Sequence, residues 1–251
     1  MSLTFKLLST NAKEPELDES MYYNLTSARE ITIPAWSHER VPTDVAIQMP
    51  EGCYGRLAAA KTPLGLVIGA GVIDPDYTGN IEVLLQNCSY NPCHIKIGQV
   101  IVRLICHKIA YNEILYTLHS ENASPPKRMT PEAAGYDLYS AQDAITIPPW
   151  ESATVSTDLS INKLPEECYG RLAMRSGTCS RHGLFLSNDV VIENEIINLD
   201  LMNLSNKHVE IKRGDRLVQL ICEKILFCGV PIKASSFRET DRNDKGFGST
   251  G

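Results

Sequence analysis

The sequence predicts an all-β protein of two similar domains that arose by internal duplication. Three pairs of segments recur with a spacing of roughly 115 residues, which is the length of a complete domain rather than of a solenoid repeat. The pairs are Ile31–Trp36 with Ile145–Trp150, Gly52–Ala58 with Glu167–Ala173, and Leu104–Ile109 with Leu220–Ile225. Because the register is kept throughout, each half is expected to have the same fold.

Each copy consists of short stretches rich in Val, Ile, Leu, Thr and Tyr, separated by Gly, Pro, Asn and Asp. Ile95–Ile109 and Val209–Ile225 are examples. Closely spaced strands of this kind are typical of a β-sandwich or β-barrel. No long segment keeps a helical period, so only Thr62–Val67 and Ser176–Phe185 are expected to carry a turn or two of helix.

The boundary between the copies is expected in a polar linker. The segment His119–Lys127 combines Ser, Glu, Asn and two adjacent prolines, a composition typical of connections between domains. We therefore predict a first copy at 1–117, a linker at 118–130, a second copy at 131–237 and a flexible tail at 238–251.

The composition predicts a globular protein that does not coat nucleic acid. The 251 residues are 43% hydrophobic and 22% charged, which allows a core in each half. The net charge is −6 and the pI is near 5.6, whereas phosphate contacts require clustered Lys and Arg. Any anionic ligand is therefore expected to be held locally.

Neither secretion nor membrane insertion is expected. No apolar run approaches the roughly 20 residues that cross a bilayer, and the first residues do not resemble a signal peptide. Four of the eight cysteines recur at equivalent places in strand-like segments: Cys53, Cys106, Cys168 and Cys222. We interpret these as buried thiols of a reducing compartment, so an intracellular location, cytoplasmic or nuclear, is expected.

The two copies have lost complementary segments. Ala134–Leu138 of the second copy contains a Gly and an acid that the aligned Ser20–Asn24 of the first copy lacks. The second copy alone also has Arg175–Gly177, where the first has Ala60–Thr62, and Gln219, where the first has Arg103. The first copy alone has Gly69–Gly79, whereas the corresponding Val190–Ile196 is shorter and lacks the Tyr-x-Gly. Only the second copy ends in Gly246–Gly251. Each segment survives once, which indicates one active site built from both copies.

These segments resemble the five sequence motifs of the dUTPases, and the resemblance covers nearly the whole chain. One motif in the first copy and four in the second is similar to the duplicated, single-chain dUTPases of the herpesvirus type. The resemblance implies two tandem jelly-roll or β-barrel domains. It also implies a monomer, in which one chain forms the site that subunits of the usual homotrimer share.

The resemblance further implies hydrolysis of dUTP to dUMP and pyrophosphate, by Mg²⁺-assisted attack of water on the α-phosphorus. Asp74 matches the catalytic acid that orients and deprotonates the water. Asp137 matches the acid that holds Mg²⁺ through water. Tyr77 matches the aromatic residue that packs on deoxyribose and excludes a 2′-hydroxyl. Gly71 and Gly79 are implied to form a tight hairpin whose backbone contacts uracil, and Ile73 between them is also implied to bind the substrate.

Two further groups of residues are implied to bind the substrate. Arg175, Ser176, Gly177 and Gln219 match the phosphate-binding motifs, with Met174 in place of the usual Pro. In the tail, Phe247 is implied to stack on uracil, and Arg242, Ser249 and Thr250 are implied to meet the phosphates. Gly248 is also implied to bind the substrate. Closure of such a tail would exclude water from the site.

Each residue also has an ordinary structural explanation when it is considered alone. Asp137 fits a turn, Asp74–Gly79 a hairpin loop, Gln219 an exposed strand position and the tail a frayed terminus. The length of the resemblance outweighs these explanations. Arg103 and Lys61 are either surface charges or marks of a silenced pocket, and Glu193 is assigned no role.

Two other functions remain open from the sequence. A catalytically retired dUTPase-like binding or regulatory protein is expected to have lost a motif from both copies, yet each motif survives once. A nucleotide enzyme similar to dCTP deaminase is disfavoured by Asp74–Tyr77 and by Phe247–Gly251. The products distinguish these functions, because deamination liberates ammonia and dUTP hydrolysis liberates pyrophosphate.

Overall fold

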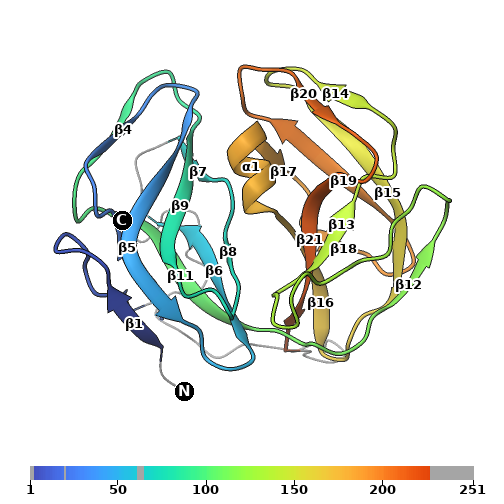
Figure 1. Cartoon of the computed structure of the whole chain (residues 1–251), viewed down its shortest axis with the longest axis horizontal. Coiled ribbons are helices and arrows are strands. Elements are labelled where there is room, and N and C mark those ends of the chain that lie inside the picture. Colours follow the sequence, from blue (N-terminus) through green and yellow to red (C-terminus); the bar gives the residue numbers. More distant parts are fainter. Residues whose placement is uncertain (1–2, 20, 61–64, 227–251) are drawn as a thin grey trace, which may run out of the picture.

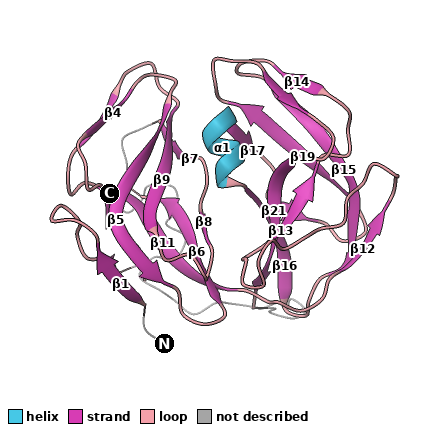
Figure 2. Cartoon of the chain, in the orientation of Figure 1, coloured by secondary structure: helices cyan, strands magenta, loops and turns pink. Residues whose placement is uncertain are grey.

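The computed structural model describes residues 3–19, 21–60 and 65–226. These residues form two β-rich lobes that lie side by side, with a single short helix between them (Figure 1, Figure 2). The lobes correspond to the two sequence copies, so the predicted all-β fold with internal duplication is confirmed. The strands of the described part form open sheets rather than a closed barrel.

The first lobe contains a four-stranded, a five-stranded and a two-stranded sheet. The four-stranded sheet has the order β1 (Thr4–Leu7), β5 (His38–Gln48), β9 (Asn80–Asn87), β7 (Leu66–Ile68). The five-stranded sheet has the order β2 (Glu16–Leu17), β3 (Tyr23–Thr26), β11 (Val100–Lys108), β6 (Cys53–Ala59), β8 (Val72–Ile73). The remaining pair is β4 (Ile31–Ile33) with β10 (Cys93–Ile95).

The second lobe repeats this arrangement. Its first sheet has the order β12 (Leu115–Leu118), β15 (Ser152–Lys163), β19 (Ile196–Asn203), β17 (Leu184–Leu186). Its second sheet has the order β13 (Tyr136–Tyr139), β21 (Arg216–Lys224), β16 (Cys168–Met174), β18 (Val190–Val191). The remaining pair is β14 (Ile145–Ile147) with β20 (Val209–Ile211), and the helix is α1 (Ser176–His182).

Strand alternation explains how each lobe forms its core. In β19 the residues alternate between exposed and buried, so Ile197, Leu199 and Leu201 point inward. A strand with one wet and one buried face is the usual arrangement in antiparallel sheets. Each lobe thereby encloses its own apolar cluster, one of which extends to Leu84 of the other lobe.

Strand register corrects one detail of the alignment between the copies. Asn24 lies opposite Arg103 in the first lobe, as Asp137 lies opposite Gln219 in the second. Asn24, and not Tyr23, therefore occupies the position of Asp137. The loss of the acid from the first copy stands, and its replacement is an amide that carries no charge.

Helix α1 lies within the segment predicted to contain a helical turn. It ends at Gly183, which has a φ of 65° and donates its N–H to Cys179 O at 2.8 Å. This left-handed conformation suits glycine, because it has no Cβ to clash with the backbone. A Cβ added to Gly69 of the first lobe would lie 2.6 Å from the Cys179 sulfur, so the two lobes approach closely here. In the first copy, residues 61–64 of the predicted helical segment lie outside the described residues, and Leu66 begins a strand.

The pairing of β12 bears on the boundary between the copies. This strand, at 115–118, pairs with β15 of the second lobe in the way that β1 pairs with β5 of the first. We therefore propose that the second domain begins a few residues before Leu115, ahead of the predicted linker.

The four cysteines that recur in both copies were expected to be buried thiols, and no membrane-spanning segment was expected. Cys53 and Cys222 are buried, as predicted, but Cys106 and Cys168 are only half-buried. All four are free thiols. Within the described part of the chain, no helix is both long enough and apolar enough to span a bilayer.

An asparagine in each lobe ties a turn to the sheet. The Asn203 amide donates to the carbonyls of Ile147, Pro148 and Lys207 at 2.8–3.0 Å. Asn87 makes the equivalent three contacts in the first lobe. Both side chains are buried, so these hydrogen bonds have no ready substitute from water.

We predict that Asn203→Ala lowers the free energy of unfolding by about 3 kcal/mol, because three backbone carbonyls, one of them buried and two part-buried, lose their donor. Chemical denaturation measures this change. Asn206→Ala, at an exposed position of the same loop, is the control and should change stability by less than about 0.5 kcal/mol. Equal stabilities for the two variants would contradict the prediction.

Candidate active site between the two lobes

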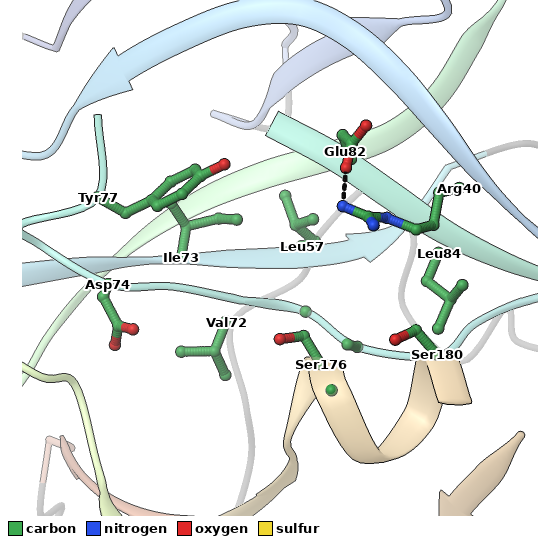
Figure 3. Close-up of a pocket in the computed structure, with 13 residues that line it drawn as sticks. Arg40, Leu57, Val72, Ile73, Asp74, Tyr77, Glu82, Leu84, Ser176 and Ser180 are labelled. Atoms are coloured by element: carbon green, nitrogen blue, oxygen red, sulfur yellow. Dashed lines mark hydrogen bonds and ion pairs between the residues drawn. The ribbon is translucent and has the colours of Figure 1, made fainter. Parts of the chain in front are cut away.

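Two adjoining cavities lie where the lobes meet, and residues of both copies line them. The larger has a volume of about 410 Å³ and lies between Asp74 and Tyr77 of the first lobe and Ser176 of the second (Figure 3). The smaller, of about 150 Å³, is lined by Asp137 and Gln219 and shares Asp74 and Ser176 with the larger. The structure thus brings Asp74 together with residues that lie 63 (Asp137), 102 (Ser176) and 145 (Gln219) positions further along the chain.

Asp74 stands at the junction of the two cavities. It follows β8, whose pairing with β6 through Ile73 and Gly55 fixes the approach of the chain. Its Oδ1 accepts a hydrogen bond of 2.9 Å from the N–H of Ala134, which belongs to the second copy. The carboxylate of one lobe is therefore oriented by the backbone of the other.

The segment from Gly71 to Gly79 differs from the hairpin that we predicted. The N–H of Tyr77 does close a tight turn on Asp74 O at 3.1 Å. The flanking strands, however, pair in different sheets: β8 with β6, and β9 with β5 and β7. The prediction of a paired hairpin is therefore wrong, because Val72 and Ile73 complete the β6 ladder and do not return onto β9.

The nucleoside-side residues of the prediction all line the larger cavity. These residues are Gly71, Ile73 and Tyr77. A Cβ on Gly71 would lie 2.8 Å from Leu57 O, so only glycine fits there. The Tyr77 ring stands beside Ile73 (Figure 3), and its hydroxyl donates to Asn80 O at 2.7 Å, which fixes the ring at the cavity wall.

Asp137 lies at the floor of the smaller cavity, where two arginines compensate its charge. Its carboxylate is 2.9 Å from Arg175 Nε and 3.4 Å from Arg216 Nη1. Asp137 is 6% exposed. Arg175 precedes α1 in an extended conformation, and its guanidinium contacts Asp137 on β13.

Small or uncharged polar groups complete the smaller cavity. Ser176 and Gly177 begin α1, and Gln219 lies on β21 directly opposite Asp137. A Cβ on Gly135 would lie 2.9 Å from Gln219 Oε1, so glycine at this position leaves room for the amide. The cavity therefore presents a hydroxyl, an amide and a guanidinium, all of which can bind phosphate oxygens.

Burial dominates the ionisation of both acids. Desolvation raises the pKa of Asp74, and the charges of Asp76 and Asp137 add to this, while the Ala134 N–H and Arg175 partly offset it. Desolvation also raises the pKa of Asp137, against the opposing effect of Arg175 and Arg216. Two acids with raised pKa values in one cleft are typical of a functional site.

The side chains of the smaller cavity suit a metal ion that is coordinated mainly by the oxygens of a bound ligand and by water. Among the described residues, no group of three or more His, Cys, Asp or Glu side chains is placed to hold a metal ion. Mg²⁺ commonly keeps several waters and needs only one or two carboxylates when substrate phosphates supply other oxygens. Asp137 with water fits that pattern.

The other residues singled out from the sequence either lie outside the described residues or make contacts elsewhere in the described part of the chain. The tail residues Arg242, Phe247, Gly248, Ser249 and Thr250, and also Lys61, lie outside the described residues. Arg103 pairs with Asp18 at 3.3 Å and lies over the ring of Tyr22. Glu193 accepts a hydrogen bond from the N–H of Leu164, which gives this residue a structural role.

The sequence did not reveal two components of the site. Arg216 pairs with Asp137, but a register shift in β13 between Leu138 and Tyr139 determines where Arg216 lies. Its position three residues before Gln219 was the available signal. The N–H of Ala134 carried no sequence signal, because any residue except proline has this donor.

Comparison with known proteins identifies the family. A family model described as dUTPase matches the chain twice, at residues 10–124 and 121–251. The human mitochondrial deoxyuridine 5′-triphosphate nucleotidohydrolase is 45% identical over 134 residues, which are 53% of this chain and 52% of the human protein. The variola virus protein of the same description is 40% identical over 140 residues, 55% of this chain and 92% of the viral protein. The chain belongs to the dUTPase family.

The matched regions are partial. The chain spans 52% of the human relative and 64% of the rat relative. Among solved structures, a mutant dUTPase of phage 80alpha aligns at 25% identity with a TM-score of 0.45, over 55% of this chain and 98% of that chain.

We predict that Asp74→Asn raises the melting temperature at neutral pH. Between the ordinary Asp pKa and the raised pKa of folded Asp74, the folded protein binds more protons, so stability falls as pH rises through this window. The neutral side chain of the Asp74→Asn variant avoids the cost of burying a charge, and its amide oxygen can still accept a hydrogen bond from the Ala134 N–H. The gain in melting temperature should vanish below the ordinary Asp pKa, where Asp74 of the wild type is also neutral. Thermal scans at several pH values measure it, with Glu166→Gln as an exposed control; a wild type more stable than Asp74→Asn at neutral pH would count against the assignment.

Proposed function

We propose that this chain hydrolyses dUTP to dUMP and pyrophosphate at one composite site between its lobes. The observation that carries the proposal is that Asp74 of the first copy lines the same cavity as Asp137, Arg175 and Gln219 of the second. Membership of the dUTPase family supports the choice of substrate. A solved phage dUTPase structure contains the nucleotide analogue dUpNHpp.

The two cavities fit the two ends of the substrate. The triphosphate lies in the smaller cavity, where Arg175 supplies charge and Ser176 and Gln219 supply hydrogen bonds. The deoxyuridine lies in the larger cavity against Gly71, Ile73 and Tyr77. The α-phosphorus then lies at the junction, next to Asp74.

In the reaction, a water molecule attacks the α-phosphorus and the bond from that phosphorus to the bridging oxygen breaks. Asp74 accepts the proton of the water, and pyrophosphate leaves with the bond electrons. The N–H of Ala134 keeps the Asp74 carboxylate aimed at the junction. Burial strengthens Asp74 as a base, because it raises the pKa of the carboxyl group.

Asp137 would hold a Mg²⁺ ion through water, and the ion would neutralise charge on the phosphate oxygens. Arg175 and Arg216 keep the Asp137 carboxylate in place. The tail residues Arg242 and Phe247–Thr250 are proposed to close over the nucleotide, as the sequence motifs imply. Closure by this segment would exclude bulk water from the reacting phosphate.

Tyr77 is proposed to select the sugar. Its ring lies at the wall of the larger cavity and is held by the hydrogen bond to Asn80 O. A 2′-hydroxyl would collide with the ring, so ribonucleotides are rejected by shape. One site for each chain, working as a monomer, is the assembly that the complementary losses imply.

We predict that the wild type releases pyrophosphate from dUTP with Mg²⁺ and that Asp74→Asn lowers kcat by at least about 100-fold, because the general base is lost. UTP and dCTP are control substrates and should be turned over poorly. Light scattering on the same material gives the mass in solution.

Three outcomes would oppose this function. Well-folded protein that does not turn over dUTP would favour a retired binding or regulatory protein. Ammonia release from dCTP would favour a deaminase. Full activity of Asp74→Asn would show that the Asp74 carboxylate is not needed, and hence that the first lobe does not supply the general base.

A further inference from the structure

A buried ionic network joins the lobes at a distance from the two cavities. Its centre is Glu223, which is 1% exposed. The carboxylate accepts hydrogen bonds from Tyr169 at 2.6 Å and from Arg171 Nε at 2.5 Å, both in the second lobe. It also accepts a hydrogen bond from the hydroxyl of Tyr54, which belongs to the first lobe.

Tyr54 is the residue through which the network crosses between the copies. Its hydroxyl donates to Glu223 and accepts from Arg171 Nη2 at 2.8 Å. The side chain is fully buried in an apolar cluster that includes Ala134 and Ile221 of the second copy. Ala134 is also the residue whose N–H holds Asp74.

Each strand that enters the network also leads to the site. Arg171 lies on β16, which runs directly into Arg175, and Glu223 lies on β21, which also carries Gln219. Tyr54 precedes Gly55, which pairs with Ile73 next to Asp74. A shift of Tyr54 against Glu223 would therefore reach Asp74 across the pairing of β6 with β8, and Arg175 along β16.

The network is specific to the pairing of two different copies. Strand register places Arg56 and His107 of the first lobe at the positions of Arg171 and Glu223. His107 Nδ1 lies 3.8 Å from Glu223, so an acid of one copy faces the imidazole of the other. A Glu at position 107 would instead place a second carboxylate beside the buried Glu223, which is unfavourable because like charges repel.

Stability alone gives a weak reason to keep such a network. Replacement of a buried ion pair by apolar residues is often neutral or stabilising, because desolvation offsets the attraction between the charges. Hydrogen bonds of fixed direction, by contrast, define a single arrangement of the groups that they join. The network is therefore suited to fixing the geometry between the lobes.

We propose that Glu223, Tyr54 and Arg171 form a positioning network that sets the place of Asp74 relative to the phosphate-binding residues. The proposal rests on the proposed function, because it assigns the purpose of the network to that site. None of the three residues touches the reacting atoms. They act through β6, β16 and β21.

The two equivalent tyrosines provide a matched test. Tyr54→Phe removes a hydroxyl that crosses between the lobes, and Tyr169→Phe removes a hydroxyl that contacts the same carboxylate from within one lobe. We predict that Tyr54→Phe lowers kcat for dUTP about tenfold, because small misplacements of catalytic groups are costly. KM should change less than kcat, because the phosphate-binding residues Arg175, Ser176 and Gln219 all lie in the second lobe and the proposed nucleoside contacts all lie in the first. Tyr169→Phe should keep kcat.

A second measurement does not depend on activity. The amide of Ala134 donates to Asp74 across the interface, so its hydrogen exchange reports whether the lobes stay in register. We expect faster exchange of this amide in Tyr54→Phe, and wild-type exchange in Tyr169→Phe. Glu223→Gln keeps an acceptor for the Tyr54 hydroxyl, so the Ala134 amide should exchange more slowly in this variant than in Tyr54→Phe.

The outcomes separate the two proposals. Wild-type kcat and wild-type Ala134 exchange in Tyr54→Phe would overturn the positioning network, as would equal effects of the two tyrosine substitutions. If the wild type does not hydrolyse dUTP, the proposed function fails, and the exchange measurement still decides whether Tyr54 fixes the interface.

Discussion

The contact between the lobes buries a carboxylate of one copy against the backbone and cations of the other, and the candidate site depends on this contact. Asp74 loses hydration at the interface and gains the N–H of Ala134 in return. The same burial that disfavours its charge makes it a stronger base. A small separation of the lobes would hydrate Asp74 and remove its donor at the same time.

Duplication explains why the two copies diverged in complementary ways. Once both copies lie in one chain, each residue of the site is needed only once. In the first copy, Asn24 and Arg103 occupy the positions of Asp137 and Gln219, and Arg103 is engaged by Asp18 and Tyr22. In the second copy, Ile192 stands near the position of Asp74. The connection that follows Ile192 is shorter and has no counterpart of Tyr77.

Much of the fold was predictable from the sequence because its signals are local. The repeated segments, the strand alternation and the turn residues determine two similar β-rich lobes, and Gly183 ends the helix expected after Arg175. The grouping of Asp74 with Asp137 and Arg175 was also predictable, since each motif survives in one copy alone. These inferences needed only the order of residues and their periodicity.

Other features depend on contacts that no local pattern encodes. The position of Arg216 follows from a register shift, and the alignment of Asn24 required the strand pairs. Val72 and Ile73 have the composition of a hairpin strand but complete the β6 ladder. The meeting of Tyr54 with Glu223 arises only when the lobes pack, so the separate copies gave no indication of it.

The central claim is that one chain forms the whole site. Its most direct test mixes two variants, Asp74→Asn and Asp137→Asn, each altered in a different lobe, and measures pyrophosphate release from dUTP. The account predicts that each variant alone and the mixture are inactive, because every site then carries one altered acid. Activity restored by mixing would contradict the account, since it would require sites assembled from lobes of different chains.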